Sequence, residues 1–143
     1  MKIFSIAAML GLTLTACEGR SSNLDAASPG GRIMYPITAE QADGVLSRAM
    51  TATFPETPVA TLAGPNKGYM ATISFAMDSH RFTATAVPAA GLRPDGSRAE
   101  GYAFTVSDYG TIPITASRRS SALFQAINQD AAAITPPLRM AGN

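Results

Sequence analysis

Two neighbouring stretches in the middle of the chain alternate with a period of two, and this pattern constrains the fold more than any other feature. They read "YMATISFAM" and "RFTATAV", residues 69–77 and 81–87. Such alternation predicts β-strands that bury one face. Because few residues separate the stretches, we predict an antiparallel hairpin whose turn is Asp78, Ser79 and His80.

An amphipathic helix is predicted on either side of these strands. Thr38 and Gln41 have the spacing of a capping box and precede an apolar stripe that ends near Pro55. A second stripe covers residues 120–134. Two more strands are predicted, at 102–107 and at 111–115, the latter an edge strand because of Pro113. We therefore expect an α+β two-layer sandwich, with an antiparallel sheet of three to four strands and an N-terminal and a C-terminal helix.

The connection at residues 88–101 is expected to be a long loop, because Pro88 should end the strand before it. Loops of this length in a small domain are often either functional or mobile. One interpretation is a floppy hairpin tip. The other is a partner-binding loop that presents Leu92, Arg93 and Arg98 around a rigid turn.

The N-terminal segment has the composition of a secretory signal peptide. Lys2 precedes an apolar run of about a dozen residues, which is shorter than the ~20 residues that a membrane-spanning helix needs. The segment ends with Leu14-Thr15-Ala16-Cys17, and Cys17 is the only cysteine. This ending resembles the lipobox of bacterial lipoproteins. The resemblance implies lipidation of Cys17 and removal of residues 1–16 as a lipoprotein signal peptide.

The same resemblance implies a location in the bacterial cell envelope. Several acyl chains on Cys17, of the palmitate kind, would hold the protein on a membrane, whereas one chain binds only reversibly. Glu18, rather than Asp, follows the cysteine, which implies the outer membrane facing the periplasm. We expect a lipidated, flexible tether at 17–33, one globular domain at 34–136 and a loose tail at 137–143.

Composition excludes several classes of site. Once Lys2 is removed with the signal peptide, acidic and basic side chains balance, so neither nucleic-acid binding nor a polybasic membrane patch is indicated. With one histidine and no cysteine beyond Cys17, common zinc and iron sites are not expected, and no metal or cofactor is predicted. The only membrane contact predicted is the lipid anchor.

No catalytic group stands out in the sequence. His80 beside Asp78 is interpreted as a solvated turn histidine, and Ser120 with Ser121 as helix-capping residues. Arg118 and Arg119 are interpreted as solvent-exposed surface residues, although such a pair can also bind a phosphate or a cell-wall carboxylate. We therefore do not expect this protein to be an enzyme.

The hypothesis is a membrane-anchored periplasmic lipoprotein that acts as a non-enzymatic interaction or assembly module and contacts another envelope protein. The alternative is a binder of a small envelope ligand, either a lipid or a cell-wall fragment. Such a ligand would occupy a cavity between the sheet and the helices.

Overall fold

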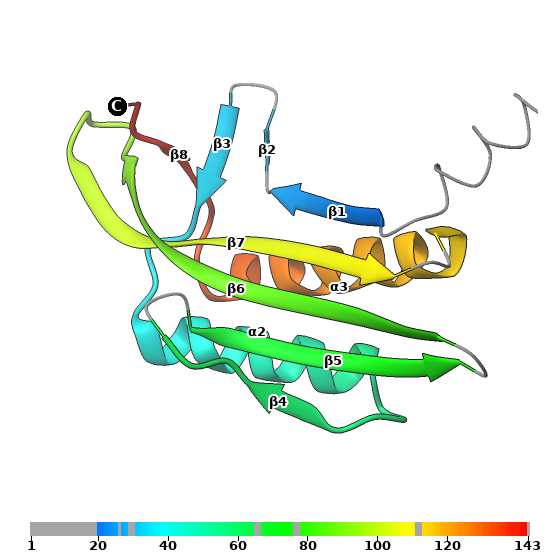
Figure 1. Ribbon diagram of the computed structural model, residues 1–143. Coiled ribbons are helices and arrows are strands. Elements are labelled where there is room, and N and C mark those ends of the chain that lie inside the picture. Colours follow the sequence, from blue (N-terminus) through cyan, green and yellow to red (C-terminus); the bar gives the residue numbers. More distant parts are fainter. Residues whose placement is uncertain are drawn as a thin grey trace, which may run out of the picture.

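A long antiparallel hairpin, β6–β7, organises the computed structural model, which describes residues 20–25, 27–28, 31–64, 67–75, 78–110 and 113–142 (Figure 1). We call the hairpin end with Asp78 and Gly110 the base, and the end with Leu92 and Arg98 the tip. The elements are β1 (Arg20–Asp25), β2 (Ala27–Ser28), β3 (Gly31–Met34), α2 (Ala39–Thr53), β4 (Val59–Thr61), β5 (Gly68–Phe75), β6 (Asp78–Leu92), β7 (Arg98–Gly110), α3 (Pro113–Ile134) and β8 (Leu138–Met140).

The predicted two-layer sandwich with three to four strands is wrong, because the sheet is much larger. Six strands follow one another in the order β1-β7-β6-β8-β3-β2, all antiparallel, and β5 with β4 branches from β6. β5 and β8 share the edge of β6 that β7 leaves open, β5 near the base and β8 at the tip. The strands that the sequence did not predict are short and do not alternate apolar with polar residues, so no sequence periodicity indicates them.

The strand that Pro88 was expected to end continues through it to Leu92. Pro88 pairs with Tyr102, whose N–H and C=O both bond Tyr35 and therefore face away from β6. Pro88, the residue of β6 opposite Tyr102, must likewise direct its backbone amide away from β7. The missing N–H of Pro88 thus faces the stretch of edge between Thr85, which pairs with the first residue of β5, and Gly91, which pairs with the last residue of β8. Proline is tolerated at such an unpaired edge.

α2 and α3 lie side by side against one face of the hairpin (Figure 1). The capping box is confirmed: the Gln41 N–H donates to Thr38 Oγ1 at 3.1 Å, and the Thr38 N–H donates to Gln41 Oε1 at 3.0 Å. The core between helices and sheet is apolar and includes Val45, Leu46, Met50, Phe54, Phe82, Phe104, Val106, Leu123 and Ile127.

α3 is longer than predicted, and its first residue is Pro113. The predicted edge strand at 111–115 is therefore wrong from Pro113 onward, while residues 111–112 lie outside the described part. A proline at the first helical position costs no hydrogen bond, because that amide would have no partner within the helix, and its fixed φ suits a helix.

The hairpin buries opposite faces in its two halves. On β7, Ala99 and Gly101 are buried near the tip, whereas Phe104, Val106 and Asp108 are buried toward the base. β6 and β7 pair without a bulge. When burial shifts from odd-numbered to even-numbered residues of β7, the buried face of the hairpin therefore changes. Near the tip, β3 and the residues after it supply the cover: a Cβ at Gly101 would overlap the Tyr35 carbonyl and the side chain of Met34.

Both ends of the described chain join the sheet. The tail expected to be loose contains β8, which pairs with β3 and β6. The segment expected to be a tether, residues 17–33, contains β1, β2 and the beginning of β3. The predicted signal peptide and lipobox, residues 1–17, lie outside the described residues.

Candidate functional site

A short, hydrogen-bonded turn at residues 93–97 closes the tip. The Arg93 N–H donates to the Ser97 carbonyl and the Gly96 N–H to the Arg93 carbonyl, each at 2.9 Å, with Gly96 at a φ of 85°. Asp95 Oδ1 accepts from the Ser97 N–H at 2.9 Å and from its hydroxyl at 2.7 Å, which lowers the pKa of Asp95. The long loop predicted at 88–101 is wrong, because all of it except this turn is paired strand.

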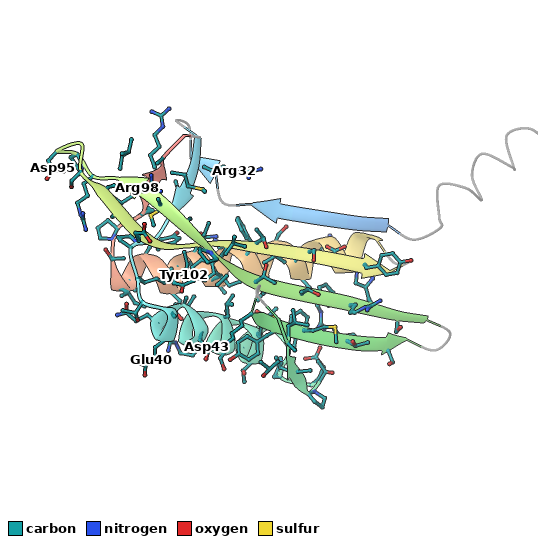
Figure 2. All side chains as sticks on the ribbon, turned by 60° about the vertical axis from the view of Figure 1, so that its left-hand side comes forward. Arg32, Glu40, Asp43, Asp95, Arg98 and Tyr102 are labelled. Carbon is teal, nitrogen blue, oxygen red and sulfur yellow. The ribbon has the colours of Figure 1, made fainter. Side chains whose placement is uncertain are left out.

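The three residues predicted to contact a partner lie together at this tip. Leu92 is 46% exposed and pairs with Arg98 on β7 and with Arg139 on β8. Arg93 lies in the turn, and its guanidinium donates to the Arg98 carbonyl at 3.2 Å. Figure 2 shows Arg98 and Asp95 at the end of the hairpin. The result is an ordered surface in which an exposed leucine is flanked by arginines.

The interpretation of His80 as a solvated turn histidine is wrong. His80 lies on β6, is 2% exposed and packs against Phe82 with ring centroids 4.9 Å apart. Its Nε2 is 3.4 Å from Oδ1 of Asp108 on β7, so its carboxyl neighbour is Asp108 rather than Asp78. Asp108 is an even-numbered residue of β7, like the buried Phe104. This alternation was the signal in the sequence that could have placed Asp108 on the buried face.

Ser120 completes a buried cluster of three polar side chains, and its hydroxyl donates to Oδ2 of Asp108. The carboxyl group therefore lies between the serine and the histidine, whereas a hydrolase triad places the histidine between the other two. Neither ring nitrogen of His80 meets hydrogen-bond criteria with a partner among the described residues. All three side chains are buried, and the cluster joins β6, β7 and α3.

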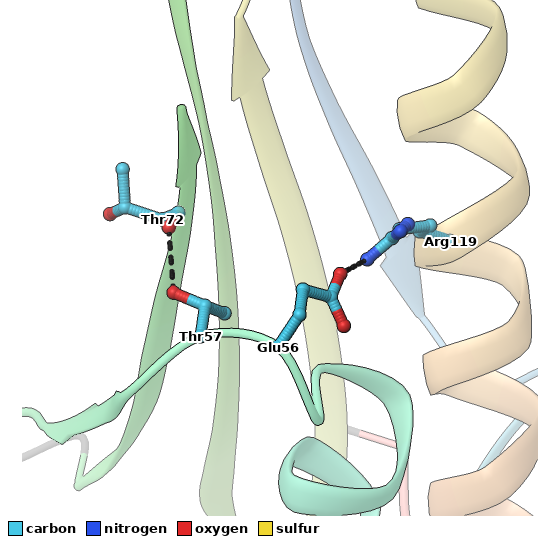
Figure 3. Close-up of polar contacts among 4 residues, drawn as sticks. All are labelled: Glu56, Thr57, Thr72 and Arg119. Carbon is cyan, nitrogen blue, oxygen red and sulfur yellow. Dashed lines mark hydrogen bonds and ion pairs between the residues drawn. The ribbon is translucent and has the colours of Figure 1, made fainter. Parts of the chain in front are cut away.

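The serine and arginine pairs before the second predicted helix have different roles from those predicted. Ser120 lies inside α3, so it does not cap the helix, and Ser121 is exposed. Arg119 forms an ion pair with Glu56, as Figure 3 shows, and its guanidinium also lies over the Phe54 ring, 5.8 Å from the centroid. The ion pair joins α3 to the segment after α2. Arg118 is exposed.

Two cavities flank the middle of the hairpin on opposite faces. One, of about 140 Å³, lies between α2 and the sheet, with Leu46, Asp43 and Tyr102 in its wall. The other, of about 220 Å³, is lined by Ile33, Val87, Ala89, Ala103 and Met140, among others, on the face without helices. Both are mainly apolar, and both are smaller than the ~300–1,000 Å³ typical of ligand pockets.

Within the described ranges, no three His, Cys, Asp or Glu side chains gather as a metal site would require. In the same ranges, no helix is both long enough and apolar enough to span a bilayer. Cys17, the predicted lipidation site, lies outside the described residues.

No family model matches the chain, and no curated protein matches it.

Proposed function

We propose that the protein is a lipid-anchored, non-enzymatic interaction module of the cell envelope that holds the hairpin tip away from its membrane. The tip is the partner-binding element, through Leu92, Arg93 and Arg98. The predicted lipobox supports the anchor. The ordered turn supports binding, because a preformed surface loses little conformational freedom when a partner docks.

One observation carries this orientation. Arg20, three residues after Cys17, pairs with Gly110 at the base of the hairpin. The tip begins at Arg98, twelve residues along β7, which corresponds to about 40 Å of strand. A lipid on Cys17 would therefore keep the base near the bilayer, and the length of the hairpin lets the tip reach into the aqueous space. The ligand-binding alternative is less well supported, because the cavity between helix and sheet has only about 140 Å³.

The experiment introduces a photo-reactive amino acid at Leu92 in the full chain and exposes cell envelopes to light. We expect a discrete adduct that Arg98→Glu reduces, because the substitution reverses a charge beside Leu92. The matched control places the same photo-reactive group at Ser121, which is exposed on α3. Equal adducts from both positions would exclude the tip as the interaction site. A Cys17→Ser protein that still carries lipid by mass spectrometry would exclude the anchor.

A further inference from the structure

We propose that the base of the hairpin docks on the lipid headgroups of the anchoring membrane through Tyr109 and Arg81. This inference rests on the proposed lipidation of Cys17 and adds a second contact between the protein and the bilayer. The surface consists of the exposed side of β6 and β7 nearest Gly110, on the face that α2 and α3 leave open (Figure 1).

Chain length brings this surface to the bilayer. Two residues lie between Cys17 and Arg20, so the three peptide units that join them span at most about 11 Å. Arg20 pairs with Gly110, and the next pair in the ladder is Ser21 with Tyr109. An acylated Cys17 therefore confines Tyr109 to the neighbourhood of the membrane surface, whatever path the three intervening peptides take.

The chemistry of the pair fits a headgroup layer. Tyr109 is 51% exposed, although it lies in a strand whose alternate residues are buried. Its cross-strand partner is Arg81, whose guanidinium lies over the tyrosine ring at 5.9 Å from the centroid. Tyrosine is enriched at membrane interfaces, where its ring and its hydroxyl meet apolar and wet surroundings. The guanidinium beside it suits lipid phosphate, which arginine recognises well.

Charges of both signs lie near the base, where Asp78 begins β6 and the arginines of α3 lie on the helix side of the sheet. Ser120 bonds Asp108, which places the first half of α3 against the base end of β7. Arg118 in that half is exposed. The neighbouring acidic residue Glu56 is paired with Arg119, so its charge is compensated.

The sequence contains no tryptophan, so a single substitution creates a site-specific fluorescent reporter. Tyr109→Trp is prepared in the full, lipidated chain and reconstituted into vesicles with brominated acyl chains, after mass spectrometry confirms the lipid. Leu92→Trp is the matched control, because Leu92 is similarly exposed but lies at the other end of the hairpin. We expect Tyr109→Trp to lose most of its emission and Leu92→Trp to keep it. Arg81→Gln added to Tyr109→Trp should reduce the loss.

The outcomes separate the two proposals. If the protein carries lipid and Tyr109→Trp is quenched no more than Leu92→Trp, docking of the base is refuted while the anchor remains. If no lipid is found, the proposed function fails first. Should Tyr109→Trp lack the circular dichroism of the parent protein, Ser107→Trp provides the reporter, since it occupies the same face of β7 two residues away. Absence of quenching there has the same meaning.

Discussion

Replacing Ser120 with alanine tests whether the buried cluster stabilises the fold. The substitution removes the hydroxyl that donates to Asp108 in a site where Ser120 is 1% exposed and Asp108 4%. A hydrogen bond to a charged partner contributes about 1.5–3 kcal/mol. At roughly 4 °C per kcal/mol for a domain of this size, the melting temperature should fall by about 6–12 °C.

The next residue gives a matched control. Ser121 occupies the same helix but is exposed. Serine to alanine gains the same helix propensity at either site, roughly half a kcal/mol, so the difference between the two variants isolates the buried contact. Ser121→Ala should be neutral or slightly stabilising.

The assays are thermal unfolding, which gives the melting temperatures, and denaturant unfolding of both variants, followed by circular dichroism, with the slopes compared as well as the midpoints. A lower midpoint at unchanged slope would show lost stability rather than a changed unfolded state. If Ser120→Ala unfolds at the same denaturant concentration as Ser121→Ala, the cluster does not stabilise the fold, and the reasoning from its burial is refuted.

Three further predictions concern single positions. Gly110→Ala should destabilise by about 1–3 kcal/mol in denaturant titration, because its Cβ would overlap the buried imidazole, while Gly142→Ala, with open space around it, should not. Thr38→Ala should lower the free energy of unfolding by about 1 kcal/mol through loss of the helix cap, and an unchanged value would contradict this. Asp95 should titrate below its usual pKa of 3.8 by NMR, so its stabilising effect on the tip is present above that value and is lost as pH falls through the folded pKa. Ser97→Ala should raise the pKa of Asp95, and a pKa that stays low would show that another group holds it down.

Local pattern predicted the parts of the fold that depend on near neighbours. The capping box at Thr38 and the pairing of β5 with β6 both involve residues close in sequence, where spacing alone carries the information. The missed elements depend on distant partners. β1 reads as a polar linker and is a strand only because β7 lies beside it, and β8 pairs across more than a hundred residues with β3.

The candidate site was likewise predicted only where its residues are close in sequence. Leu92, Arg93 and Arg98 were found from their nearness in sequence, but Arg139 joins them only through the pairing of β8. His80 was misassigned because Asp78 is adjacent in sequence, whereas Asp108 becomes adjacent only when β6 and β7 pair. Pro88 was read as a strand end because the direction of its missing N–H depends on the register with Tyr102.

The change of buried face along β7 means that different elements cover the two halves of the hairpin, although Tyr35, which follows β3, belongs to the same apolar core as Phe104. Helices protect the half toward Gly110, whereas β3 and β8 protect the half toward Arg98. The half toward Arg98 is covered by the short strands β3 and β8 rather than by helices, so we expect it to open more readily than the half toward Gly110. Amide hydrogens near Ala99 should therefore exchange with solvent deuterium faster than those near Val106.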